Sequence, residues 1–99
     1  MNKKNLLVIL FSFFSLFSFS QNYTISGYIQ EASNGENLIG VSVYDKSTNQ
    51  GTSSNQYGFY SITLPKGEYK IIYSFIGLKT VEKPINLEEN LRLNISLKD

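Results

Sequence analysis

The sequence predicts an all-β domain, a sandwich or barrel of about seven short strands, and three observations support this prediction. Apolar and polar residues alternate with a period of two over several short segments. After residue 20, no segment has the apolar spacing of an amphipathic helix longer than about one turn. Turn-forming glycines divide the alternating segments at fairly regular intervals, at positions Gly27, Gly35, Gly40, Gly51, Gly58, Gly67 and Gly77.

Residues 1–20 have the composition of an export signal. Two lysines precede an apolar run over residues 6–19, which is interrupted only by serines and ends in small residues. The run is shorter than the roughly twenty apolar residues that a spanning helix needs, so a membrane anchor is the weaker interpretation. The chain has no cysteine to carry a lipid anchor. We expect a signal-peptide helix, cleavage between Ser20 and Gln21, and a mature domain over residues 21–99.

The charge of the expected mature domain argues against nucleic acid as a partner. Without the two lysines of the export signal, seven basic and eight acidic residues remain, which gives a net charge of −1. No basic patch is available to neutralise a phosphate backbone. The absence of cysteine also excludes disulfide bonds, so stability must come from sheet pairing and aromatic packing.

The first half of the mature segment predicts three strands. Residues 23–31 alternate cleanly, and a turn follows at Asn34-Gly35. Residues 38–45 form a second alternating segment, and the polar run 46–55 predicts a turn with a short edge strand. The residues expected on the inner faces are Ile25, Gly27, Ile29, Val41 and Val43.

The middle of the chain predicts a β-hairpin around which the other strands are organised. Its turn is Leu64-Pro65-Lys66-Gly67, which places proline and glycine at the second and fourth positions that a type I turn favours. Period-two alternation on both sides of such a turn is the usual hairpin signal. The residues expected to face the core are Tyr60, Ile62, Leu64, Tyr69, Ile71, Tyr73 and Phe75.

The last part of the chain predicts two more strands. Residues 79–85 form one strand, with Pro84 near its end, where an edge position tolerates a missing N–H. Residues 86–90 are a polar connection. Residues 91–97 show the cleanest alternation in the chain and predict one closing strand, with Leu91, Leu93, Ile95 and Leu97 facing inward.

The residue types exclude most catalytic sites. The chain has no histidine and no cysteine, so neither a Ser-His-Asp triad nor a Cys-His pair is available. The usual zinc ligands are absent for the same reason. We therefore expect no enzymatic activity, no cofactor and no metal.

Tyrosine is the residue type that points to a binding surface. Tyr28, Tyr44 and Tyr57 have outward parity or lie in loops. Exposed tyrosines offer a large contact area with a polar tip, so these three are the candidate ligand surface. The alternative is that they are isolated surface residues without a ligand.

Several short motifs, in this order and spacing, resemble the carboxypeptidase-regulatory-like domain, a transthyretin-like β-sandwich of the broader immunoglobulin-like architecture. The resemblance covers essentially the whole mature segment, and Leu78 departs from it because the family more often has an aromatic residue there. The motifs are Ile25-Ser-Gly27-Tyr-Ile29, Leu38-Ile-Gly40-Val41, Asn55-Gln-Tyr-Gly58-Phe-Tyr60, Leu64-Pro65-Lys-Gly67 and Phe75-Ile76-Gly77.

The resemblance implies a function outside catalysis. In this family, such a domain directly after an export signal most often begins a TonB-dependent outer-membrane receptor of nutrient uptake, where it lies in the periplasm. It implies a fragment without plug and barrel, and membrane contact only through that barrel. The implied partners are periplasmic proteins or the receptor's own plug and barrel, while the oligomeric state stays open. The alternative is a free-standing secreted or periplasmic module that binds carbohydrate or peptide.

Overall fold

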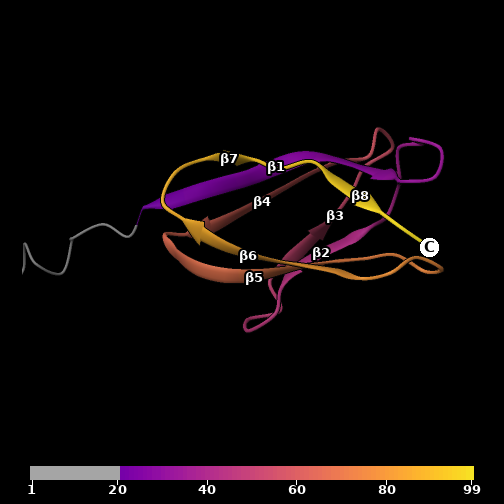
Figure 1. Ribbon diagram of the computed structural model, residues 1–99. Helices are drawn as coiled ribbons and strands as arrows, with labels where there is room; N and C mark the ends of the chain where they lie inside the picture. Colours follow the sequence, from indigo (N-terminus) through magenta and orange to yellow (C-terminus); the bar gives the residue numbers. More distant parts are fainter. Residues whose placement is uncertain (1–20) are drawn as a thin grey trace, which may run out of the picture.

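The computed structural model describes residues 21–99 as two packed β-sheets, with no helix in that range (Figure 1). This confirms the predicted all-β sandwich, with eight strands where about seven were expected. The predicted signal-peptide helix and Ser20 lie outside the described residues. The strands are β1 (Asn22–Glu31), β2 (Ser42–Asp45), β3 (Gly51–Ser53), β4 (Phe59–Pro65), β5 (Gly67–Ser74), β6 (Val81–Leu87), β7 (Leu91–Arg92) and β8 (Ile95–Leu97).

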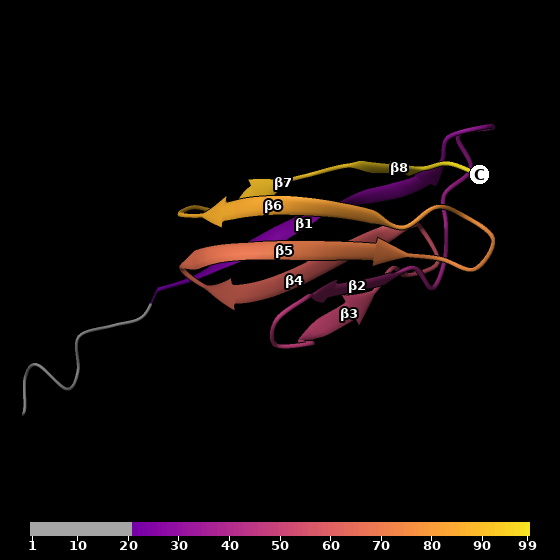
Figure 2. The ribbon, with the colours of Figure 1, turned by 60° about the horizontal axis from the view of Figure 1, so that its bottom comes forward.

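The two sheets have different pairing patterns (Figure 2). In the first sheet, β1 is central, pairs antiparallel with β4, and pairs parallel with both β7 and β8. The second sheet has the order β3-β2-β5-β6 and is antiparallel throughout. The connections β1–β2, β3–β4, β4–β5 and β6–β7 therefore cross from one sheet to the other, which interlocks the two layers.

The core lies between the sheets and consists largely of the alternating side chains that the sequence places inward. Burial of these aliphatic and aromatic groups is the main stabilising term of such a domain. Four of the residues expected to face inward are exceptions, because they are only partly buried at the margin of the core: Tyr69, Phe75, Leu91 and Leu93. Leu87 was expected in a polar connection, but β6 extends to it and it is fully buried. The buried apolar residues include Ile25, Ile29, Val41, Val43, Tyr60, Ile62, Leu64, Ile71, Tyr73, Ile85, Leu87, Ile95 and Leu97.

The segment predicted as a β-hairpin is a turn that carries the chain from one sheet to the other. Only Lys66 separates β4 from β5, yet β4 pairs with β1, and β5 pairs with β2 and β6. The hairpin prediction is therefore wrong, although the turn lies at the expected place. Period-two alternation reports which face of a strand is buried, and it does not report which strand lies alongside. Here the inward side chains of β4 and β5 meet across the core, as Tyr60 and Tyr73 do.

The predicted single closing strand over residues 91–97 is split into β7 and β8. Both pieces pair with β1 in the same register, so the break at Leu93 and Asn94 is local. At the break the chain lies so close to β1 that a Cβ on Gly27 would be 2.1 Å from the Leu93 carbonyl oxygen, a contact that only glycine avoids. Two side chains form hydrogen bonds with the backbone at this break. The Tyr60 hydroxyl donates to the Leu93 carbonyl oxygen at 2.6 Å, and the Asn94 Oδ1 accepts from the Tyr28 amide of β1 at 2.9 Å.

The strand predicted over residues 38–45 is shorter than expected, because β2 begins only at Ser42. Gly40 has a φ of 79°, which interrupts the extended backbone before it. The buried Ser54 side chain binds the backbone there: its Oγ accepts from the Val41 amide at 2.9 Å and donates to the Leu38 carbonyl at 2.6 Å. Leu38 and Val41 thus stay in the core without a regular strand.

Candidate functional site

The structure separates the three candidate tyrosines. Tyr28 is 41% exposed on the outer face of the first sheet, whereas Tyr44 is half-buried on the outer face of the second. Tyr57 is 63% exposed in the loop between β3 and β4. That loop adjoins β1, because the Ile29 amide donates to the Gly58 carbonyl at 2.8 Å. Tyr28 and Tyr57 therefore lie towards the same part of the first sheet, and Tyr44 belongs to the opposite side of the sandwich.

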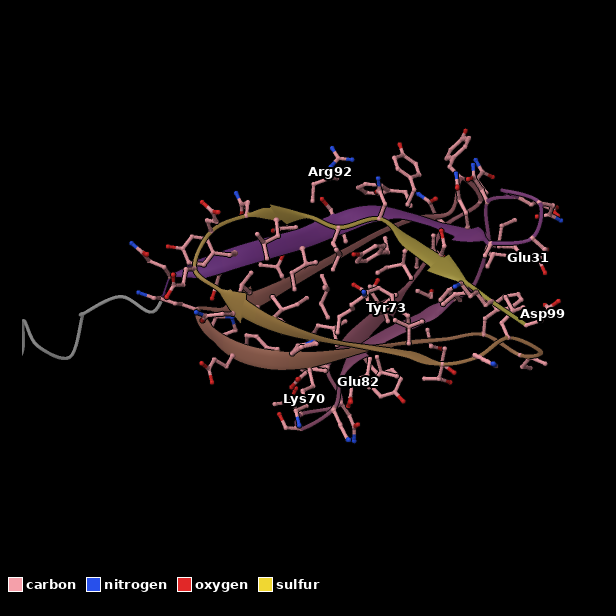
Figure 3. All side chains as sticks on the ribbon, in the orientation of Figure 1. Glu31, Lys70, Tyr73, Glu82, Arg92 and Asp99 are labelled. Atoms are coloured by element: carbon pink, nitrogen blue, oxygen red, sulfur yellow. The ribbon has the colours of Figure 1, made fainter. Side chains whose placement is uncertain are left out.

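Tyr28 is part of an aromatic and cationic group that the sequence pattern did not reveal. Its ring contacts Phe59 edge-to-face with a centroid separation of 5.3 Å. The Arg92 guanidinium carbon lies 6.0 Å from the centre of the Phe59 ring, within the range of a cation–π contact. Figure 3 shows Arg92 on this outer side, while Lys70 and Glu82 lie on the outer side of the second sheet. The group depends on cross-strand register between β4, β1 and β7, which spacing along one strand does not report.

Beside Tyr28 lies a small hollow of about 260 Å³, lined largely by amide side chains. Two hydrogen bonds fix these three amides. The Asn94 Oδ1 accepts from the Tyr28 amide at 2.9 Å, and the Gln30 Nε2 donates to the Asn37 Oδ1 at 3.2 Å. The N–H groups of Asn94 and Asn37 and the oxygen of Gln30 are the groups left to bind a neutral polar ligand.

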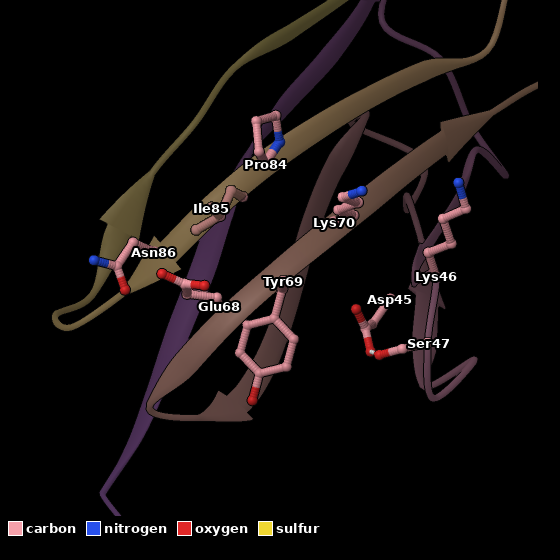
Figure 4. Close-up of a pocket in the computed structure, with 9 residues that line it drawn as sticks. All are labelled: Asp45, Lys46, Ser47, Glu68, Tyr69, Lys70, Pro84, Ile85 and Asn86. Carbon is pink, nitrogen blue, oxygen red and sulfur yellow. Dashed lines mark hydrogen bonds between the residues drawn. The ribbon is translucent and has the colours of Figure 1, made fainter.

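A second hollow, of about 740 Å³, lies where β2 ends beside β5 (Figure 4). Asp45 lines it and is buried, while its Oδ2 accepts from the Ser47 hydroxyl at 2.9 Å and from the Thr48 hydroxyl and amide at 2.7 and 3.1 Å. Burial raises the pKa of the carboxyl, but the hydrogen bonds from Thr48 and Ser47 outweigh it and hold the pKa of Asp45 below its ordinary value. Asp45 therefore stays ionised and organises the turn that follows β2.

Two tyrosine hydroxyls in the core form a chain of hydrogen bonds between the sheets. The hydroxyl oxygens of Tyr60 and Tyr73 are 2.8 Å apart, and Tyr60 donates its only hydrogen to the Leu93 carbonyl. Tyr73 must therefore be the donor to Tyr60. Burial raises the pKa of both hydroxyls, so both stay neutral at physiological pH. Figure 3 places Tyr73 between the sheets, where its role is structural.

The described residues offer candidate contact surfaces. Within residues 21–99, no cluster of three or more histidine, cysteine, aspartate or glutamate side chains is placed to hold a metal ion. In the same range, no helix is long and apolar enough to cross a membrane. The candidate sites are thus the outer face around Tyr28, the hollow at Asp45 and the exposed strand edges.

Three relatives of this chain are TonB-dependent receptors. The chain is 33% identical over 90 residues to TonB-dependent receptor P39 of Formosa agariphila, a match that covers 91% of this chain. It is 32% identical over 99 residues, its whole length, to TonB-dependent receptor SusC of Bacteroides thetaiotaomicron. The chain spans about 9% of the length of each of these relatives.

Solved structures share the fold at low sequence identity. A DUF3823 family protein from Bacteroides ovatus matches with a TM-score of 0.56 and 19% identity, over 78% of this chain and 44% of its own. The Bacillus anthracis TIE protein matches with a TM-score of 0.58 and 14% identity, over 79% of this chain and 17% of its own. These likenesses concern the fold alone. The CarboxypepD_reg-like domain family matches residues 25–99, and this chain belongs to that family.

Proposed function

We propose that this chain is a non-enzymatic, periplasmic accessory domain of a TonB-dependent outer-membrane receptor of nutrient uptake. The observation that carries the proposal is the similarity to two TonB-dependent receptors over 91% and 100% of this chain, which amounts to 9% of each receptor. The matched region is a small part of each receptor, so it is suited to contact the other parts of a large assembly. Its partner is the receptor's own plug and barrel or another periplasmic protein.

The chemistry of the chain supports a contact role over a catalytic one. The sequence contains neither histidine nor cysteine, so the common nucleophile–base pairs are not available. Its surfaces are strands with tyrosine, amide and hydroxyl side chains. We further propose that residues 1–20 direct export and are removed between Ser20 and Gln21, which leaves a domain over residues 21–99.

Three measurements test this proposal. The genomic reading frame beyond codon 99 is expected to encode a plug and a β-barrel, and the mature N-terminus determined by mass spectrometry is expected to be Gln21. The tagged product of the complete gene should fractionate with the outer membrane. A stop codon after codon 99, together with recovery of the protein from the culture medium, would contradict the proposal.

The second candidate function is a free-standing secreted or periplasmic module that binds carbohydrate or peptide. The arrangement around Tyr28 favours it, because an exposed ring lies beside amides with fixed donors and acceptors. NMR titration of the exported chain with a glycan and peptide panel tests this function. Shifts at Tyr28 and Tyr57 without a shift at Tyr44 would support it, and unchanged signals at Tyr28 and Tyr57 would exclude this surface.

A further inference from the structure

We infer that the open edge of β4, at Ser61 and Thr63, takes up one extended strand from a partner polypeptide. The inference rests on the proposed contact function and specifies where on the domain that contact is made. Pairing at a sheet edge is a general mode of peptide recognition, in which backbone hydrogen bonds supply the affinity.

The hydrogen bonds of β1 establish which way the backbone groups of β4 point. On β1, the Thr24 and Tyr28 amides bind side chains next to β7 and β8, and the Ser26 carbonyl accepts from Leu93. The odd-numbered β1 residues therefore direct their N–H and carbonyl groups to β4. Their pairing partners are the even-numbered β4 residues from 60 to 64, which point their own N–H and carbonyl groups back to β1. The N–H and carbonyl groups at positions 59, 61 and 63, and the carbonyl of Pro65, therefore point away from β1.

Both ends of this edge are already occupied. The Phe59 amide donates to the Asn55 Oδ1 at 3.1 Å, and the Phe59 carbonyl accepts from the Asn55 amide at 2.9 Å. At the other end, Pro65 has no N–H, and its carbonyl accepts from the Tyr69 hydroxyl at 2.6 Å. The open stretch is thus confined to Ser61 and Thr63, which present two donors and two acceptors to a partner strand.

The other sheet edges in the described part of the chain are less suitable. On β5, Lys70 points its carbonyl towards β2, since it accepts from the Lys46 amide at 3.0 Å. Its partner on β6, Pro84, therefore occupies an outward position and removes a donor there. The opposite edge of the first sheet is broken between β7 and β8, and β3 has only three residues. β4 is the longest edge that carries neither a break nor a central proline.

The surroundings of this edge fit a single strand better than a second copy of the domain. A hollow of about 400 Å³ between β3 and β4 has the open edge as one wall, so the edge is recessed. None of its lining residues is charged, and charge is the usual protection of an edge strand. A narrow extended segment with alternating β-branched apolar and polar residues matches both the recess and the pleat of β4. The lining residues are Gln50, Gly51, Thr52, Ser61, Ile62, Thr63 and Leu64.

The probe for this inference is a capped seven-residue peptide of sequence Lys-Thr-Val-Thr-Val-Thr-Lys, added to the exported and purified chain. We expect saturable NMR shifts at Ser61 and Thr63, with amide hydrogen exchange at both positions slowed at least tenfold at saturation. The outward amide of Glu82 on β6 is the internal reference and should not change. Absence of binding up to millimolar peptide, or protection at β6 instead, would refute the inference.

A matched pair of variants identifies the backbone donor. Ser61→Pro removes the outward N–H of Ser61. Pro65 and Pro84 already stand at outward edge positions of this kind, so the fold should tolerate the change, while peptide binding should weaken roughly two- to tenfold. Ser61→Ala keeps the N–H and should bind like the wild type. Equal binding by both variants would overturn the inference, and amide exchange in the wild type decides the matter if Ser61→Pro does not fold. Concentration-dependent dimers that protect the same amides would overturn the choice of partner.

The outcome is independent of the test of the proposed function. A reading frame with plug and barrel together with a peptide that does not bind would refute only the edge inference. Peptide binding together with a stop codon after codon 99 would refute only the receptor assignment.

Discussion

Replacement of Tyr60 by phenylalanine should destabilise the domain more than the same change at Tyr73. Tyr73 donates to Tyr60, and Tyr60 donates to the Leu93 carbonyl at the break between β7 and β8. Tyr60→Phe therefore removes the donor to Leu93 and the acceptor of Tyr73 together. Tyr73→Phe removes only one donor, and the Tyr60–Leu93 hydrogen bond remains.

The magnitudes follow from the groups left without partners. An intact hydrogen bond contributes about 0.5–1.5 kcal/mol, whereas a buried polar group left unpaired costs about 1–3 kcal/mol. Tyr73 is fully buried, so its unpaired hydroxyl falls in the upper range. We expect a loss of about 2–4 kcal/mol for Tyr60→Phe and about 1 kcal/mol for Tyr73→Phe. The double variant should be no less stable than Tyr60→Phe alone, because the second change removes the unpaired hydroxyl.

Urea unfolding of the wild type, both single variants and the double variant measures these free energies as a double-mutant cycle. Tyr28→Phe is the control, because its partly exposed ring keeps the contact with Phe59, and its loss should stay below about 0.5 kcal/mol. A larger loss of unfolding free energy for Tyr73→Phe than for Tyr60→Phe would refute the assignment of Tyr73 as donor and Tyr60 as acceptor. Strict additivity in the double variant would show that the two hydroxyls do not form one network.

Three further predictions concern the backbone contact at β1, the turn after β2 and the surface of the second sheet. Gly27→Ala should destabilise by about 2–3 kcal/mol in urea unfolding, because its Cβ would lie 2.1 Å from a carbonyl oxygen; a neutral result would contradict the close approach. The pKa of Asp45 is lower in the folded than in the unfolded chain, so it contributes stability that is present above the unfolded pKa of about 3.9 and is lost as pH falls through the folded pKa. Asp45→Asn should therefore reduce the loss of unfolding free energy at acid pH. An unchanged acid dependence in this variant would disprove the linkage. Lys46→Ala removes an exposed 3.1 Å ion pair with Glu82 and should lower the free energy of unfolding in urea by less than about 1 kcal/mol. A larger loss would contradict the expectation that solvent screens this exposed pair.

Burial could be predicted from the sequence far better than strand partners could. The alternation of Tyr60, Ile62 and Leu64 assigns these residues to the core, and the structure buries all three. The same alternation is compatible with a hairpin and with a turn between two sheets, because both arrangements bury one face of each strand. The connection at Lys66 is of the second kind, since β4 and β5 pair with different strands. Strand partners depend on contacts between residues far apart in the chain.

The candidate sites were less predictable for the same reason. Tyr28 and Tyr44 have similar outward positions in the sequence, yet the order of the strands places them on opposite faces of the sandwich. Phe59 and Arg92 join Tyr28 only through the register of β4 and β7 with β1. An outward residue can be recognised along one strand, but a surface is formed by neighbours in several strands.

The protection of the sheet edges links fold and proposed function. Pro84 was expected near a strand end, but it lies in the middle of β6, where it removes a donor from an outer edge. The break at Leu93 and Asn94 shortens the strands at a second edge. At β4, Asn55 and Tyr69 occupy the two ends and leave Ser61 and Thr63 open. Protection of this kind prevents unselective pairing, and a single gap within it is where a domain of this fold would make a selective contact with a partner strand.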